Sequence, residues 1–298
     1  MIFDLAISYE WIYDIEFTHL IEERFQRENL STFVITTHNC NEVTNLVKEK
    51  KLFFRSYLDR ASDVDENFSE LAQLLTESDC RVINEYAKVD SSVDKSMAHQ
   101  KLVDAGLRIP QTIIIPSYDS EPTLNLTDIE LDNIGKPFVV KPAYYSGGSE
   151  GVYKNVSSLD EIQLIRRENS DDKYLIQEKI YPTSINNQRA WFRVFWAFGR
   201  VLPMLWDDNK LIYSDLKPSQ MDQSLLDEIG TMMTKISSVA QLDYFSSEFA
   251  LDSKNDFYLI DYINDQCDMR LKSSHKDGVP NYIVEEFIDE MIKFVKQL

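Results

Sequence analysis

The sequence predicts a two-part protein, an α/β layer followed by an α+β region, and three observations support this class. Over the first ninety residues, apolar strand-like runs alternate with amphipathic stretches, which is typical of a parallel sheet covered by helices. From residue 137 onward, strands rich in aromatic residues follow one another, as in antiparallel sheets. A chain of 298 residues also allows about two domains at roughly 150 residues each.

The periodicity predicts the elements of the first part in order. Strands are expected at residues 2–7, 32–35, 52–54 and 81–83, and helices at 15–27, 42–50 and 68–77. The first glycine of the chain is Gly106, so this layer contains no Gly-x-Gly-x-x-Gly dinucleotide loop. A nicotinamide-dependent enzyme is therefore disfavoured.

A helix is expected between the two parts. Ser91 and Asp94 have the spacing of a capping box, and Gly106 with Pro110 marks the end of the helix. Lys95 then lies in the first turn, where a cation opposes the helix dipole unless an anion such as Asp94 compensates it. The predicted apolar stripe consists of Met97, Ala98, Leu102 and Val103.

The second part is expected to contain strands within residues 137–145, 173–182, 189–206 and 248–264. The last of these segments is predicted to be a hairpin with its loop at 252–256. Two helices are expected, one at 223–241 and a closing one that begins at Pro280, and each has its apolar residues on one face.

Charge and cysteine content limit the partners and the compartment. The chain has 50 acidic and 31 basic side chains and no concentrated basic run, so we expect neither nucleic acid nor a membrane as partner. Cys40, Cys80 and Cys267 are too far apart for a metal cluster and are expected to be free thiols. With no signal-peptide pattern and no run of about 18 apolar residues, the predicted location is cytoplasmic.

A strand followed by a glycine-containing loop is the leading candidate for phosphate binding. The apolar strand delivers Lys141, and the backbone N–H groups of the loop can surround phosphate oxygens. The alternative is an ordinary hairpin with a flexible tip, because short Gly/Ser clusters are common turns. The loop residues are Ser146, Gly147, Gly148, Ser149, Glu150 and Gly151.

Two other strands carry candidate residues. Glu178 ends an apolar strand, where backbone groups can pair with an adenine edge and the carboxylate can accept its amino group, although a Glu-Lys pair at a strand end is usually solvated. Arg193 is the only charge in the apolar run 191–198, so it requires an anion. That anion is either a structural carboxylate, or a phosphate or substrate carboxylate.

Glu248 and Asp261 are acids inside apolar runs, and the predicted hairpin can bring both onto one face of a sheet. Two converging carboxylates require a cation, and Asn264 would add a neutral oxygen. This donor set suits Mg²⁺, which an acidic chain also needs if it is to bind ATP. The alternative is a pair of exposed acids at a sheet edge.

Taken in order, these segments resemble the ATP-grasp superfamily, which includes D-alanine–D-alanine ligase, glutathione synthetase and the ribosomal-protein glutamate ligase. The similarity runs from about Asn84 to Arg270. It rests on six loose motifs in the family's order: Asp94-Lys95; the turn from Gly106 to Thr112; the strand and loop at Lys141; Glu178-Lys179-Ile180; Arg193-Val194-Phe195 with Gly199-Arg200-Val201; and Glu248 with Asp261 and Asn264.

The resemblance implies a Rossmann-like domain over residues 1–90 and an ATP-grasp domain over 91–298. The latter would have a small α+β subdomain at about 110–182 and a carboxy-terminal subdomain, which clasp the nucleotide between them. Among site residues, the resemblance implies ATP binding by Lys95, Lys141, the glycine loop, Glu178, Lys179 and Ile180, Mg²⁺ binding by Glu248, Asp261 and Asn264, and a catalytic role for Arg193.

Three positions depart from the family pattern. Arg189-Ala190-Trp191 stands where the family usually has an acid that holds the ribose, and Ser246-Ser247 stands where an arginine is common. The stretch from Asp261 to Asn264 is one residue longer than the family's Glu-x-Asn. Arg270 is predicted to supply a missing catalytic cation toward phosphate or substrate. Residues 205–208 and 272–281 are predicted to line the acceptor side.

The resemblance implies that a substrate carboxylate attacks the γ-phosphate of ATP and that an amine then displaces the resulting acyl phosphate. The expected partners are small-molecule or peptide carboxylates and amines, and a homodimer is compatible with the sequence. Two alternatives stay open: a small-molecule kinase on the same fold, and a non-catalytic nucleotide-binding or interaction module.

Overall fold

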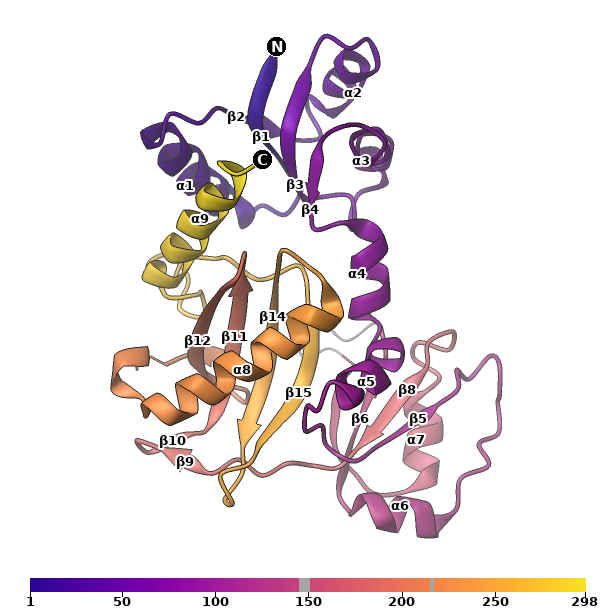
Figure 1. Ribbon diagram of the computed structural model, residues 1–298. Coiled ribbons are helices and arrows are strands. Elements are labelled where there is room, and N and C mark those ends of the chain that lie inside the picture. The colour runs from indigo at the N-terminus through magenta and orange to yellow at the C-terminus, as the bar shows by residue number, and fades with distance from the viewer. Residues whose placement is uncertain (145–150, 215–216) are drawn as a thin grey trace.

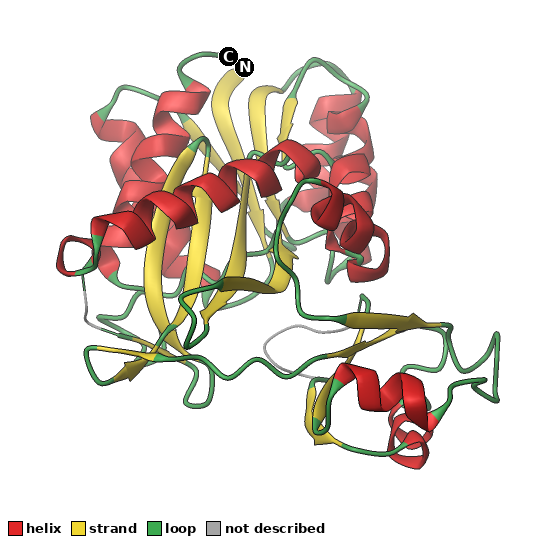
Figure 2. Ribbon diagram, turned by 60° about the horizontal axis from the view of Figure 1, so that its bottom comes forward, coloured by secondary structure: helices red, strands yellow, loops and turns green. Residues whose placement is uncertain are grey.

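The computed structural model describes residues 1–144, 151–214 and 217–298, and Figure 1 shows their arrangement. Within these ranges the strands form three sheets of four or five strands and one two-stranded hairpin. The predicted class, an α/β layer followed by an α+β region, is confirmed. Both termini lie at the same end of the molecule, as Figure 1 and Figure 2 show.

The amino-terminal sheet has four parallel strands. Its elements are β1 (Ile2–Tyr9), α1 (Asp14–Arg27), β2 (Thr32–Ile35), α2 (Cys40–Lys48), β3 (Phe53–Arg60), a 3₁₀ turn (Glu66–Phe68), α3 (Ser69–Thr76) and β4 (Arg81–Ile83). The strand order is β2-β1-β3-β4. Leu5 and Ile7 pack on the side of α1, whereas Ala6 and Ile35 share a core with α2 and α3, so both faces of the sheet are covered.

The central strand β3 is longer than the predicted 52–54 because its second half is polar but buried. Ser56 Oγ donates to the Asp4 carbonyl at 2.7 Å, and Asp59 accepts from Ser8 Oγ at 2.9 Å. Arg60 pairs with Asp14 of α1. Partners from neighbouring elements satisfy these groups, which an apolar pattern along one strand does not reveal.

The connection between the two parts consists of two helices, α4 (Tyr86–Val93) and α5 (Lys95–Asp104). The predicted capping box is wrong: Ser91 lies inside α4, where its hydroxyl donates to the Lys88 carbonyl. Asp94 alone caps α5 and accepts from the backbone N–H of Ser96 at 2.7 Å. The predicted stripe of α5 is half correct, because Ala98 and Leu102 are buried while Met97 and Val103 are exposed.

A small antiparallel sheet follows, and Figure 2 shows it set apart from the rest of the molecule. Its elements are β5 (Thr112–Ile115), α6 (Asp128–Ile134), β6 (Phe138–Pro142), β7 (Tyr153–Val156), α7 (Leu159–Ile165) and β8 (Tyr174–Gln177), with strand order β5-β8-β6-β7. Side chains of both helices and all four strands form one core between them. We call this unit the small lobe.

The remaining sheet is antiparallel, with strand order β13-β12-β11-β14-β15. Its elements are the hairpin β9 (Ser184–Ile185) and β10 (Gln188–Arg189), then β11 (Trp191–Ala197), β12 (Arg200–Asp207), β13 (Ile212–Tyr213), a 3₁₀ turn (Pro218–Gln220), α8 (Gln223–Ala240), β14 (Tyr244–Leu251), β15 (Phe257–Asn264) and α9 (Asn281–Val295). Phe192 and Val194 pack on the side of α8, and Phe195 packs on the opposite side with α9. The strand that carries Arg193 is therefore covered on both faces.

Helix α9 joins the large sheet to the amino-terminal sheet. Phe287 of α9 packs against Phe17 of α1, with ring centroids 6.2 Å apart. Arg24 of α1 donates to both carboxylate oxygens of Asp289, at 2.7 and 2.8 Å. One hydrophobic core thus contains residues from β1, α1, the large sheet and α9, and it crosses residue 90, where the resemblance places a domain boundary.

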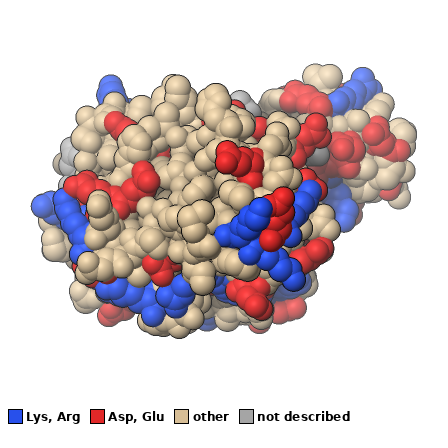
Figure 3. All heavy atoms as spheres, turned by 90° about the horizontal axis from the view of Figure 1, so that it is seen from above, with Lys and Arg blue, Asp and Glu red and all other residues tan. Residues whose placement is uncertain are grey.

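Two surface properties bear on the expected partners. No helix in the described ranges has both the length and the hydropathy that a membrane span requires. On the face seen in Figure 3, Lys and Arg side chains lie in separate groups with Asp and Glu among them.

The buried ion pair between Arg60 and Asp14 should dominate the stability of the interface around α1. Both side chains are at most 5% exposed, and Arg60 also donates to the Cys267 carbonyl at 3.1 Å. We expect R60M to lower the free energy of unfolding by about 3–5 kcal/mol, because it leaves Asp14 charged, buried and unpaired. Urea denaturation measures this change. The matched variant R27M breaks the exposed pair with Glu23 and should change stability by less than about 1 kcal/mol; equal losses would contradict the prediction.

Candidate functional site

A cavity of about 590 Å³ lies between the small lobe and the large sheet. Side chains from β6, β7 and β8 line one side, and side chains from β10, β11, β12, β14 and β15 line the other. Lys95 of α5, Asp63 of the amino-terminal part and residues of the connecting loops, among them 178–182, also line the cavity. The volume is in the range of small-molecule sites, roughly 300–1,000 Å³.

Two lysines bring buried positive charge to this cavity. Lys95 is 4% exposed and Lys141 is 5% exposed. Lys95 Nζ lies 3.3 Å from Asp261 Oδ1, so the anion that compensates Lys95 is Asp261 rather than Asp94. Lys141 Nζ donates to the Ile260 carbonyl at 2.7 Å. Burial lowers the pKa of Lys141 to about 8, with Asp261 opposing this shift and Lys95 adding to it.

The two acids of the predicted metal site face each other across neighbouring strands. Glu248 of β14 and Asp261 of β15 are direct partners in the ladder. Arg193 of β11 donates to Glu248 Oε1 through Nε at 3.0 Å, and Trp191 Nε1 donates to Oε2 at 2.8 Å. The anion that Arg193 required is thus a carboxylate of the protein, the first of the two alternatives.

An irregular ladder brings Asn264 to the same cavity. Residues 261 and 264 are three apart, so in a regular strand their side chains would point to opposite faces. Here β14 advances two residues, from Ser246 to Glu248, while β15 spans three, from Asp261 to Asn264. The extra residue is a β-bulge, and Asp261 and Asn264 both line the cavity.

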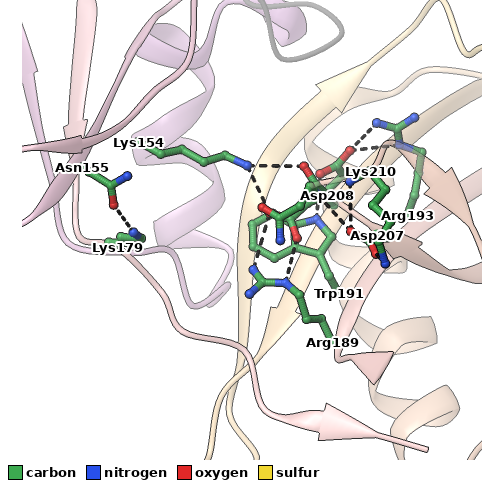
Figure 4. Close-up of polar contacts among 11 residues, drawn as sticks. Lys154, Asn155, Lys179, Arg189, Trp191, Arg193, Asp207, Asp208 and Lys210 are labelled. Carbon is green, nitrogen blue, oxygen red and sulfur yellow. Dashed lines mark hydrogen bonds and ion pairs between the residues drawn. The ribbon is translucent and has the colours of Figure 1, made fainter. Parts of the chain in front are cut away.

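Sequence reasoning missed a charged group that joins the two sides of the cavity. Figure 4 shows Lys154 of β7 reaching toward Asp208, which Arg189 contacts from the other direction. Lys154 Nζ lies 3.1 Å from Asp208 Oδ2, and Arg189 Nε lies 3.0 Å from Oδ1. Asp208 is only 7% exposed. The sequence did point to Asp208, because residues 205–208 were predicted to line the acceptor side of the site. It did not point to the partners Lys154 and Arg189, which lie far from Asp208 in sequence.

Solved structures resemble the chain along its whole length. The D-alanine–D-alanine ligase from Bacillus anthracis, complexed with ATP, matches with a TM-score of 0.65 and 15% identity over 99% of this chain and 98% of that one. ATP-grasp ligase PsnB, complexed with minimal precursor, Mg and ADP, matches at 0.62 and 13% over 97% and 98%. A RimK domain protein ATP-grasp from Sphaerobacter thermophilus DSM 20745 matches at 0.61 and 15% over 98% and 99%. No protein-family model and no curated protein matches the sequence.

The chain has the ATP-grasp fold. The cavity lies between its two antiparallel sheets, and nine predicted site residues line it: Lys95, Lys141, Glu178, Lys179, Ile180, Arg193, Glu248, Asp261 and Asn264. The tertiary structure therefore brings together side chains that are spread from residue 95 to residue 264.

The segment predicted to contact adenine connects β8 to β9 in this ATP-grasp fold. Glu178 has its backbone N–H bonded to the Gln111 carbonyl at 2.8 Å, and its carboxylate accepts from the Gln111 N–H at 3.3 Å. Lys179 Nζ donates to the Asn155 amide oxygen. Protein groups thus hold both side chains at the edge of the cavity.

One prediction concerns the glycine-containing loop after Lys141. Ser146, Gly147, Gly148 and Ser149 lie outside the described residues. Gly151 is described, with a φ of 67°, in the left-handed region that favours glycine, and it precedes β7.

The structure does not bring Arg270 to the cavity. Its guanidinium pairs with Asp268 at 2.8 Å and with Asp277 at 2.9 Å, and it lies over the ring of Trp11 at 5.6 Å. These local carboxylates satisfy the charge, so the predicted catalytic role is not supported. Residues 272–281 are likewise absent from the described lining of the cavity.

Lys141 should make stability depend on pH in a defined direction. Between pH 8 and its ordinary pKa of 10.5, the folded chain has released a proton that the unfolded chain still holds. Unfolding then takes up a proton, so stability rises with pH by up to about 1.4 kcal/mol per unit. Urea denaturation at pH 8 and pH 10 should show the wild type gaining stability relative to K141M. Parallel curves for the two proteins would contradict this.

Proposed function

We propose that this chain is an ATP-dependent ligase that joins a substrate carboxylate to an amine and releases ADP and phosphate. The observation that carries the proposal is the pair of buried lysines, Lys95 and Lys141, opposite the carboxylates Glu248 and Asp261 in one cavity. Buried ammonium groups are costly unless an anionic ligand or a carboxylate compensates them. A protein that only needed a stable core would not require this arrangement.

The charge of the cavity supports use of a metal together with ATP. Its described lining carries six cations and six acids, so it offers no excess of positive charge for a nucleotide. Divalent metal ions would supply that excess. The cations are Lys95, Lys141, Lys154, Lys179, Arg189 and Arg193, and the acids are Asp63, Glu178, Asp208, Glu248, Asp261 and Asp265.

Glu248, Asp261 and Asn264 fit Mg²⁺ by their chemistry. Among the described residues, no three His, Cys, Asp or Glu side chains are grouped as a metal site. Mg²⁺ is usually held by one or two carboxylates together with substrate phosphates, so a pair of acids and an amide oxygen suffices. When bound, Mg²⁺ would neutralise charge on the phosphates during transfer.

The roles of the side chains follow from their charge and position. Lys95 and Lys141 would bind the phosphates and orient the γ-phosphoryl group for in-line attack by the substrate carboxylate. Arg193, held by Glu248, would stabilise the charge of the transferred group. The acyl phosphate that forms loses phosphate when the amine attacks, and an amide bond results.

The fold neighbours support this assignment and the type of substrate. The Bacillus anthracis enzyme was crystallised with ATP, and PsnB with a precursor, Mg and ADP. Small-molecule and peptide carboxylates and amines are therefore the substrates to test first.

ATP binding should depend on the charge of Lys141. A hydrogen bond from a charged group is worth about 1.5–3 kcal/mol, so K141M should weaken ATP at least about tenfold in isothermal titration calorimetry. The same substitution at the surface residue Lys48, which pairs with Glu70, should leave the Kd unchanged. Equal Kd values for wild type and K141M would remove the main support for the proposal.

The acids should govern the effect of Mg²⁺ on ATP affinity. D261N removes a carboxylate and leaves Lys95 without its partner, so metal-free ATP should bind at least as tightly as to the wild type. The gain in affinity on adding Mg²⁺ should fall by about tenfold or more. D256N, which alters an acid in the β14–β15 loop that pairs with Arg108, is the matched control. A full Mg²⁺ gain in D261N would contradict this metal site.

Product analysis separates the ligase from its rivals. ADP release and mass spectrometry, run over a panel of carboxylic acids and amines, should show an amide product that requires both substrates. ADP formed with a phosphorylated hydroxyl compound and no amide would indicate a kinase. ATP binding with background ADP release across the panel would indicate a non-catalytic module.

A further inference from the structure

The ring of Tyr262 lies against Lys141, the lysine proposed to bind the phosphates, and has no role in the proposed chemistry. It is fully buried in β15, between Asp261 and Ile263. Lys141 Nζ lies over its ring, 5.3 Å from the centroid. This distance is within the range of about 6 Å in which a ring face attracts a cation.

Groups from three elements fix the ring and backbone of Tyr262. Its hydroxyl lies 2.7 Å from His99 Nδ1 of α5 and accepts from Gln177 Nε2 of β8 at 3.0 Å. Its backbone carbonyl accepts from Ser247 Oγ of β14. The ring is therefore anchored to the small lobe, to α5 and to the large sheet at once, and it has little freedom to move away from Lys141.

Lys141 needs this support because few groups compensate its charge. Its ammonium has three donors, and one of them donates to the Ile260 carbonyl at 2.7 Å. Lys95, a second cation, lies close enough to disfavour the charged form, whereas Asp261 and Glu248 favour it. A π face on the remaining side adds attraction without a second anion that would repel phosphate.

We propose that Tyr262 is a positioning residue whose ring holds the Lys141 ammonium toward the phosphates of ATP. The inference rests on the proposed function, since it requires that ATP binds at Lys141. Tyr262 lies within the irregular stretch of β15 between Asp261 and Asn264, next to one of the proposed metal-binding acids.

Two substitutions separate the ring from the hydroxyl. Y262M keeps most of the volume and removes the π face, and it should raise the Kd for ATP about tenfold. Y262F keeps the ring and should change the Kd less than threefold. Adenosine, which has no phosphate, should bind equally to the wild type and both variants, because the proposed role of Lys141 is to bind the phosphates.

A double-mutant cycle tests whether the effect passes through Lys141. In the K141M background, Y262M should cause no further loss of ATP affinity. Y258M is the matched control on the same strand, where the ring packs against Arg108 and does not line the cavity. A loss in Y258M equal to that in Y262M, or an equal loss of adenosine affinity, would show a general effect on the fold and overturn the inference.

Stepwise fluorination of a phenylalanine at position 262 provides a test that preserves shape and folding. Each fluorine withdraws electron density from the ring face, so ATP affinity should fall with each step while adenosine affinity stays constant. A flat series overturns the positioning role. Failure of the wild type to bind ATP would instead overturn the proposed function, and this inference with it.

Discussion

The burial of lysine charge between two sheets is the constraint on which the site depends. Lys95 and Lys141 are almost completely buried in a chain with an excess of acids, and each is held by a group on β15. Burial favours the neutral form of a lysine, as the lowered pKa of Lys141 indicates. The carboxylate of Asp261 and the carbonyl of Ile260 keep the two charges in place, so the position of β15 determines the electrostatics of the cavity.

The geometry of β15 follows from its irregular pairing with β14. The bulge lets Asp261 and Asn264 reach the cavity, and register shifts on both sides of Glu248 set the position of this segment. A bulge bends a strand and redirects its side chains, so one inserted residue changes which groups meet. The same segment supplies the carboxylate of Asp261, a carbonyl for Lys141 and the ring of Tyr262. Although the motif from Asp261 to Asn264 is one residue longer than in the ATP-grasp pattern, both side chains line the cavity.

Contacts between the small lobe and the large sheet differ on the two sides of the cavity. Near β15 they are buried, as with Gln177 and Tyr262. Near β12 the contact is the ion pair between Lys154 and Asp208, in which Lys154 is 37% exposed. Arg189 also pairs with Asp208, so this carboxylate keeps a cation if Lys154 moves away. Separation of the lobes on that side would therefore cost less than separation near β15.

The sequence by itself determined the fold class, the alternation of strands and helices in the first part, and nine of the residues that line the cavity. Local periodicity specifies strands and helices, and charges placed inside apolar runs, such as Arg193 and Asp261, must find partners. Only the tertiary structure decided which partners these are. Glu248 pairs with Arg193 across β14 and β11, and Asp261, not the neighbouring Asp94, pairs with Lys95. Arg270, predicted to supply a missing cation, is held by Asp268 and Asp277, while Lys154, Arg189 and Asp208 meet across distant segments. Pairing depends on register, bulges and the packing of lobes, which join residues far apart in the chain and leave no local pattern.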